Sequence, residues 1–221
     1  MFMRSYSWKQ CAIVSDNQLY WLGGSPCGGK SSVADWLSHH CHIGVYHVDD
    51  HINRHLVMIA PEKQPALHRW QTRTWDERWL QPLDRLLQDA IDCYTEHFNL
   101  LLPEVLELAR MEPLIVEGNP LLPTLIQSYL ATPSHAIYLV APPTLLRQYY
   151  QQRDWPGSIV KQCSDPEQAF NNWMERDITF AHYVEEQSRQ YHLRCLVSEA
   201  KLSIESKAKK VAAHFGFDSG L

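Results

Sequence analysis

The sequence predicts an α/β fold, in which a parallel β-sheet is covered by helices on both faces. The main observation is that short apolar runs, typical of strands, alternate along the chain with longer segments of helical periodicity. A second observation is that the first apolar run leads through a glycine-rich turn into a helical pattern. Parallel strands are joined by right-handed crossovers, so ligand-binding residues gather at the carboxyl ends of the strands.

Each element is predicted from its own stretch of the pattern. The expected strands are Leu19–Leu22, Gly44–Val48, Leu114–Glu117, Ala136–Ala141 and Leu193–Val197. The expected helices are Lys30–Ser38, a segment around Leu121–Leu130, Thr144–Gln152, Pro166–Tyr191 and Ser203–Phe215. Residues 153–165 carry a Trp-Pro-Gly turn and are expected to form a loop, after which Asp165 caps the next helix.

The alternation breaks between about residues 51 and 112, where we predict a helical insert. Apolar residues recur there at helical spacing: Trp79, Leu83, Leu86, Leu87, Ala90, Ile91, Tyr94 and Phe98. A second run surrounds Pro103, which should kink the helix or restart it. No Gly/Ser-rich linker bounds the insert, so a single domain covering residues 1–221 is expected.

Composition excludes several classes of protein. A net charge of −5, with no basic arm, argues against nucleic-acid binding. No window approaches 18 uninterrupted apolar residues, so no membrane span is expected, and the N-terminal segment lacks the apolar core of a signal peptide. The six cysteines show no CxxC spacing, which is typical of a cytoplasmic protein.

The stretch GGSPCGGKSS fits the phosphate-binding pattern G-x-x-x-x-G-K-[ST] between residues 24 and 31. Its glycines let backbone N–H groups approach phosphates, and the helix that follows adds the positive end of its dipole. Lys30 is expected to reach the β- and γ-phosphates, and the Ser31 hydroxyl to bind Mg²⁺. The predicted nucleotide-binding residues are Gly24, Ser25, Pro26, Cys27, Gly28, Gly29, Lys30, Ser31 and Ser32.

Carboxylates follow two further strands at the edge where this loop is expected. Asp49 and Asp50 end the second strand, and either could accept a proton from an acceptor hydroxyl or help to orient Mg²⁺. Asp49 is preferred because it directly follows the strand, and a helix N-cap is the alternative. Glu117 is expected to help hold Mg²⁺ or to be a polar residue at a strand exit, and Asn119 could bind acceptor or nucleotide.

Phosphoryl transfer also needs cations and a lid that excludes water. Arg153 is the preferred cation, in a lid of about residues 153–165, with Arg147 and Lys161 as weaker choices. In the insert, Arg69, Arg73 and Arg78 alternate with Trp70, Trp75 and Trp79, which could bind an acceptor's anionic group and apolar face. Core packing of the tryptophans with surface arginines is the alternative.

Together, GGSPCGGKSS, the acid pair in HVDDH, the strand end VEGNPLLP and the arginine in RDW resemble the P-loop small-molecule kinases. This nucleoside-monophosphate-kinase-like group includes shikimate, gluconate, adenylylsulfate and 2-phosphoglycerate kinases. The resemblance spans most of the chain and implies a three-layer P-loop NTPase fold, with five parallel strands in the order 2-3-1-4-5. It also implies that Lys30 and Ser31 bind phosphates and Mg²⁺, that Asp49 is the base, and that Arg153 acts from the lid.

Two departures from the family pattern concern the acceptor: the insert is longer than in the smallest members, and Asp49-Asp50 replaces a D-x-D element. The sequence therefore predicts an ATP- and Mg²⁺-dependent phosphotransferase with a small-molecule acceptor, as a monomer or homodimer. Asp50, Arg69, Arg73 and Asn119 are the expected acceptor-binding residues. The alternatives are a toxin-type or antibiotic-modifying kinase, and a nucleotide-dependent regulator with weak ATPase activity.

Overall fold

The computed structural model describes residues 18–152, 154–198 and 202–217. Its centre is a five-stranded, all-parallel sheet in the order β2-β3-β1-β4-β5, as expected. The strands are β1 (Leu19–Gly24), β2 (Gly44–His47), β3 (Leu114–Glu117), β4 (Ala136–Val140) and β5 (Arg194–Val197). The central strands β1, β3 and β4 are buried almost throughout, which explains their continuous apolar runs.

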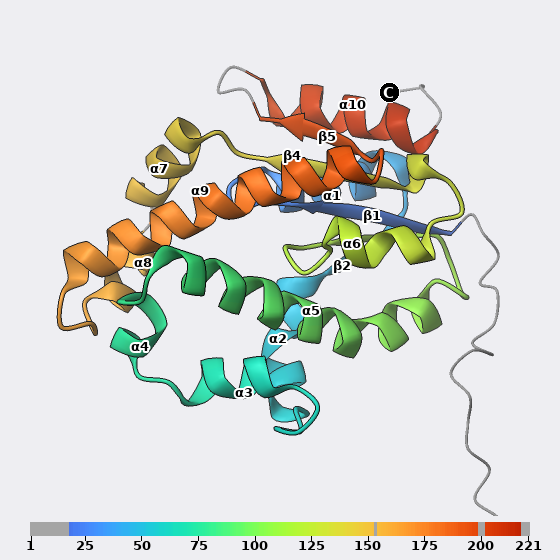
Figure 1. Cartoon of the computed structure of the whole chain (residues 1–221). Helices are drawn as coiled ribbons and strands as arrows, with labels where there is room; N and C mark the ends of the chain where they lie inside the picture. Colours follow the sequence, from blue (N-terminus) through green and yellow to red (C-terminus); the bar gives the residue numbers. More distant parts are fainter. Residues whose placement is uncertain (1–17, 153, 199–201, 218–221) are drawn as a thin grey trace, which may run out of the picture.

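Helices cover both faces of the sheet (Figure 1). They are α1 (Lys30–Cys41), α2 (Val48–Val57), α3 (Pro65–Thr72), α4 (Trp75–Trp79), α5 (Leu83–Leu108), α6 (Pro123–Ile126), α7 (Pro143–Gln151), α8 (Asp154–Val160), α9 (Pro166–Gln190) and α10 (Ile204–Phe215). Two short 3₁₀ turns, Gln127–Tyr129 and Pro133–His135, precede β4. As expected, Asp165 caps α9, because its carboxylate accepts a hydrogen bond from the Gln168 N–H at 3.0 Å.

Alternating residues of the strands form a separate core on each face. On one face Trp21 packs with Tyr138 and with the buried residues of α5 and α9. On the other face Leu22 packs with Leu139 and with α1 and α10. A third cluster joins α4, α7 and α9 beyond the end of the sheet, around Trp173. The insert helices α2 to α5 thus pack against the same sheet, through α5 (Figure 1).

Two predicted irregularities are corrected by the structure. The helix does not restart at Pro103, because α5, which is 26 residues long, runs through it without a break. Residues 154–160 form α8 rather than a loop. Pro156 lies in the first turn of α8, where a missing N–H removes no intrahelical hydrogen bond. The predicted helix around residues 121–130 is also shorter, since α6 spans four residues before a 3₁₀ turn.

Candidate functional site

The glycine-rich loop joins the end of β1 to the start of α1 and is fastened to β4. The Ser25 N–H donates to the Leu139 carbonyl at 3.0 Å, and the Ser25 hydroxyl accepts from the Ala141 N–H at 2.9 Å. Gly24 has a φ of 138°, and a Cβ there would lie 1.9 Å from the Leu139 oxygen. Only glycine therefore allows the loop to lie this close to the neighbouring strand.

The loop ends at Gly29, the N-cap of α1, in the left-handed region with a φ of 90°. The first N–H groups of a helix have no intrahelical acceptors, and they lie at the positive end of the helix dipole. On the other side of the loop, the Ser198 hydroxyl donates to the Gly28 carbonyl at 2.8 Å. The loop thus presents a backbone cradle of the kind that binds phosphate groups.

Lys30 opens α1 and is buried, with 8% of its surface exposed. Its Nζ donates to the Ser25 carbonyl at 2.8 Å and to the Asn119 side-chain oxygen at 2.7 Å. Burial lowers the pKa of Lys30, while the negative charges of Glu117 and Asp49 oppose that change. The amine is therefore held between the loop and the ends of β2 and β3, close to two carboxylates.

These two carboxylates come from neighbouring strands whose ends are in register, with His47 opposite Glu117. Glu117 is buried, and its Oε1 lies 2.8 Å from the His47 Nδ1, while the His47 Nε2 lies 3.1 Å from Asp35. Burial lowers the pKa of His47, but the hydrogen bond and charge of Glu117 more than reverse this, so the net shift is upward. His47 thus orients the Glu117 carboxylate, and the raised pKa of His47 favours its cationic form.

Asp49 and Asp50 lie in the first turn of α2, whose N-cap is His47, so neither is the capping residue. Asp49 is reached by solvent, but its carboxylate lines a cavity and is partly enclosed by the surrounding protein. Burial raises the pKa of Asp49, Lys30 opposes this rise, and the negative charge of Glu117 adds to it. Asp49 is therefore a stronger base than an ordinary aspartate.

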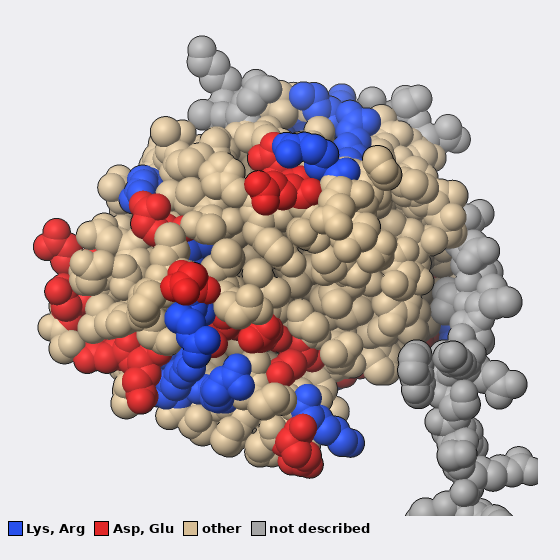
Figure 2. Space-filling model, in the orientation of Figure 1, with Lys and Arg blue, Asp and Glu red and all other residues tan. Residues whose placement is uncertain are grey.

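A cavity of about 490 Å³ opens beside these residues, between the insert and α9. Its lining includes Asp49, Ile52, Leu67, Trp70, Arg73, Trp75, Arg78, Trp79, Asp89, Tyr94, His97, Asn119, Trp173 and Arg176. Figure 2 shows lysine and arginine side chains beside acidic ones over the end of the molecule that α3 and α4 form. Asp49 and Asn119 belong both to this lining and to the surroundings of Lys30, so cavity and loop meet.

Aromatic and guanidinium groups stack along the cavity wall. The Arg78 guanidinium carbon lies 4.6 Å from the Trp70 ring centre and 4.4 Å from that of Trp75. Trp79 stacks on Trp173 with ring centres 4.2 Å apart, and Arg176 lies 5.1 Å from the Trp79 ring. The interleaved Arg and Trp residues of the insert thus form one wall, in which the tryptophans fix the arginines in place.

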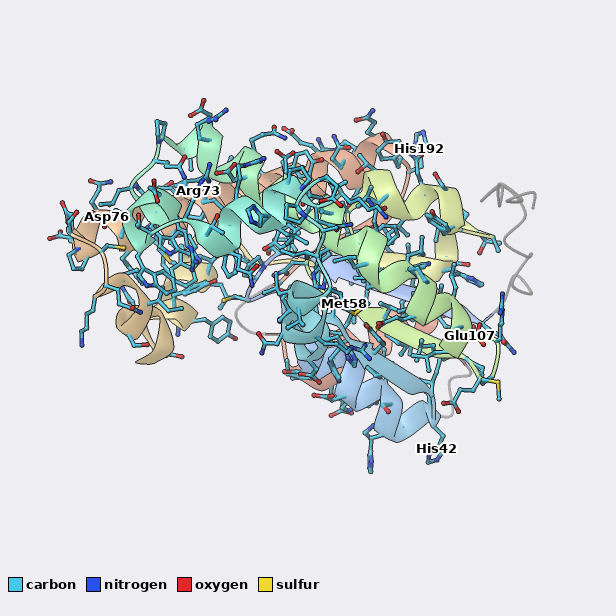
Figure 3. All side chains as sticks on the ribbon, turned by 90° about the horizontal axis from the view of Figure 1, so that it is seen from below. His42, Met58, Arg73, Asp76, Glu107 and His192 are labelled. Carbon is cyan, nitrogen blue, oxygen red and sulfur yellow. The ribbon has the colours of Figure 1, made fainter. Side chains whose placement is uncertain are left out.

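The other predicted acceptor residues differ in their positions. Arg73 lines the cavity and pairs with Asp89, and Figure 3 shows it at the end of the molecule opposite His42. Arg69 and Asp50 are exposed, and neither is among the described residues that line the cavity. Asn119 is half-buried and holds the Lys30 amine.

The predicted lid cations are only partly located. Arg153 lies outside the described residues. Arg147, on α7, pairs with Glu175 on α9, and Lys161 is exposed just after α8. Neither Arg147 nor Lys161 is among the described residues that line the cavity.

Sequence reasoning missed Arg176 and Asp177 on α9. Asp177 is buried and accepts hydrogen bonds from the Tyr150 hydroxyl at 2.7 Å and the Trp173 Nε1 at 3.1 Å. Its Oδ1 also lies 2.6 Å from the Arg176 Nε, which fixes the guanidinium at the cavity wall. The sequence did contain a signal for Asp177. It lies four residues after Trp173 and three before Phe180, so this acid falls on the apolar stripe of a helix, where a charged residue is unusual.

A chain of three side chains was also missed: Glu104, His55 and His97, which lines the cavity. The Glu104 Oε2 lies 3.2 Å from the His55 Nε2, and the His55 Nδ1 lies 2.8 Å from the His97 Nε2. Since a carboxylate only accepts, the His55 Nε2–H donates to Glu104. Burial and the neighbouring His55 lower the pKa of His97 to about 4, so the His97 ring is neutral near pH 7.

Within residues 18–152, 154–198 and 202–217, no group of three His, Cys, Asp or Glu side chains is arranged to hold a metal ion by itself. None of the helices in that part of the chain is long and apolar enough to cross a bilayer.

Solved structures with the same fold include two from kinases. A shikimate kinase from Bacteroides thetaiotaomicron is 15% identical, with a TM-score of 0.46 over 89% of this chain and 97% of that one. A kinase candidate from Chloroflexus aurantiacus is also 15% identical, with a TM-score of 0.44 over 90% of this chain and 99% of that one. No protein-family model and no curated protein sequence matches the chain. The likeness therefore concerns the fold alone.

Proposed function

We propose that this protein is an ATP- and Mg²⁺-dependent phosphotransferase that transfers the γ-phosphoryl group to a small molecule bound in the cavity. The main support for the proposal is that the glycine-rich loop and the cavity meet at shared residues. Lys30 donates a hydrogen bond to Asn119, and Asn119 and Asp49 both line the cavity. A phosphate chain in the cradle at residues 24–32 would thus end beside a bound acceptor, as direct transfer requires.

The proposed magnesium ligands are the Ser31 hydroxyl and Glu117, with water and nucleotide phosphates, and Asp49 would orient the ion through one of these waters. These oxygen donors suit Mg²⁺, which commonly binds through one or two carboxylates and substrate phosphates. The hydrogen bond from His47 would orient the Glu117 carboxylate. When bound, the ion would neutralise charge on the phosphates.

Asp49 is the proposed general base. It would take the proton from the acceptor hydroxyl while that oxygen forms its bond to the γ-phosphorus and the bond to the β-phosphate oxygen breaks, releasing ADP. Lys30 would stabilise the negative charge on the transferred group. The upward-shifted pKa of Asp49 supports this role because it makes the carboxylate a better proton acceptor.

The acceptor is proposed to carry an anionic group and a flat apolar face. Among the described residues, Arg78 forms no ion pair and lines the cavity between two tryptophans, so its charge is available to a ligand. The rings of Trp79 and Trp173 would pack on the apolar face. Arg73 and Arg176 already have carboxylate partners, so Arg78 is the preferred anion ligand.

A coupled assay of ADP release against hydroxylated carboxylates and phosphate esters tests this function. We expect one of them to stimulate turnover, and Arg78→Met to raise its KM by on the order of 10-fold or more, as for loss of a charged hydrogen bond. Arg69→Met, which removes an exposed arginine of the same segment, is the control. Tight ATP binding with slow turnover that no acceptor changes would instead indicate a nucleotide-dependent regulator.

A further inference from the structure

Lys207, on α10, is a mostly buried lysine whose amine has no partner among the described residues. It is 5% exposed, on a helix that packs beside α1. Its backbone N–H donates to the Ser203 carbonyl at 3.1 Å, but its amine forms no hydrogen bond or ion pair with the described residues, and the nearby Glu205 pairs with Lys209 at 3.1 Å. The stem of Lys207 is thus buried while its amine remains available to bind an anion.

The amine of Lys207 is directed at the start of α1. A Cβ built on Gly29, the N-cap of that helix, would lie 3.6 Å from the Lys207 Nζ. The positive end of the α1 dipole therefore faces a positive charge. Burial also lowers the pKa of Lys207, which means that its charged form is poorly solvated there. An anion bound beside Gly29 would offset the repulsion between the helix dipole and Lys207, and it would also stabilise the charged form of the lysine.

We propose that Lys207 is a second lysine ligand for the phosphate chain of the nucleotide, contacting it from the α10 side of the loop. This inference rests on the proposed function. The Lys30 amine is directed towards Asn119 and the cavity, where transfer would occur. Lys207 instead approaches Gly29 from α10, which packs beside α1. It would therefore contact the phosphates nearer the nucleoside, which ATP and ADP share, and not the transferred group.

The test compares ATP and ADP binding by titration calorimetry in the full-length protein and in three variants. Lys207→Met should weaken both nucleotides by a similar factor, on the order of 10- to 100-fold, as for loss of a charge-assisted hydrogen bond. Lys210→Met, which removes an exposed lysine three residues further along α10, should change neither affinity by more than about twofold. Lys30→Ala should weaken ATP strongly, which tests the proposed nucleotide site itself.

Thermal unfolding without nucleotide separates a ligand role from a structural one. Methionine can occupy the space of the lysine stem without a buried charge, so Lys207→Met should melt at the same temperature as the wild type or higher. A lower melting temperature, or unchanged affinity for ATP and ADP, overturns the role of Lys207. A wild-type protein that does not bind ATP overturns the proposed function, and this inference with it.

Discussion

At the scale of single residues, the site combines groups whose charges depend on one another. Lys30 is buried between Asp49 and Glu117, and its positive charge opposes the rise that burial causes in the pKa of Asp49. The same burial lowers the pKa of Lys30. A phosphate chain brought to Lys30 would strengthen the cationic form of the amine, since opposite charges favour one another most where water is excluded.

Replacing Asp49 tests the proposed base. Asp49→Asn should lower kcat by at least about 100-fold, because the amide cannot accept the hydroxyl proton, while ATP affinity changes little. The measurement is steady-state ADP release together with ATP titration. Asp50→Asn, which changes the exposed neighbour, is the matched control. Unchanged turnover in Asp49→Asn would remove Asp49 from the mechanism.

Acid should destabilise the fold through His97. Its pKa of about 4 in the folded protein lies below the ordinary value of 6.5, so the unfolded chain binds the proton first as the pH falls. Stability should therefore decrease between about pH 6.5 and pH 4, by at most about 2 kcal/mol between pH 7 and pH 5. The charged and titratable groups that influence the pKa of His97 are His55, Glu104 and His51.

Urea unfolding at pH 7 and pH 5 measures this effect. The loss of stability on acidification should be smaller in His97→Gln than in the wild type, because glutamine has no proton to bind. His39→Gln, which alters an exposed histidine of α1, should keep the wild-type loss. Equal losses in the wild type and in His97→Gln would show that His97 is not the group responsible.

At the scale of elements, the insert is organised by α5, which continues through Pro103. Tertiary packing outweighs the local signal there, because Phe98, Leu101 and Val105 are buried on either side of the proline. Pro103 itself is exposed, so its ring can lie outside the packed face. A helix can continue through a proline when buried contacts on both sides offset the lost hydrogen bond and the clash with the preceding turn.

Removing that proline should therefore stabilise the protein. Pro103→Ala restores an N–H donor in the middle of α5 and should raise the free energy of unfolding by about 1 to 3 kcal/mol. Pro82→Ala is the control, since Pro82 is the N-cap of α5, where an N–H has no intrahelical acceptor. Chemical unfolding of both variants measures the difference. An unchanged or lower free energy of unfolding in Pro103→Ala would contradict the prediction that the proline destabilises α5.

At the scale of the whole molecule, the sheet and the insert share one core. Trp21 and Tyr138 of the sheet belong to the same buried cluster as Phe98 of α5 and Phe180 of α9. We therefore expect the protein to unfold in one cooperative transition. Far-ultraviolet circular dichroism reports the helices, and tryptophan fluorescence reports the aromatic wall together with Trp21 of the sheet and Trp36 of α1, so the two midpoints should coincide. Fluorescence changing at a lower temperature would instead indicate that the insert opens as a separate unit.

How far the sequence predicts this protein depends on whether a feature is local. The loop at residues 24–32, the five strands and the cap at Asp165 each depend on a short stretch, and all appear where the pattern indicates. The insert was predicted as helical, but the path of α5 was not, since packing partners far along the chain decide it. Arg153 stays a prediction, because it lies outside the described residues.

The sequence by itself determined the fold class and the phosphate-binding loop, because strand periodicity and the glycine-lysine pattern are properties of neighbouring residues. The sequence also placed Asp49 and Glu117 at the sheet edge beside Lys30, but only the tertiary structure decided which further polar groups join this site. The carboxyl ends of β2 and β3 bring Asp49 and Glu117 towards Lys30, and α9 brings Arg176 to the cavity. The tertiary structure also decided the position of Lys207. This lysine lies beside Gly29 because α10 packs against α1, which is far from it in the sequence.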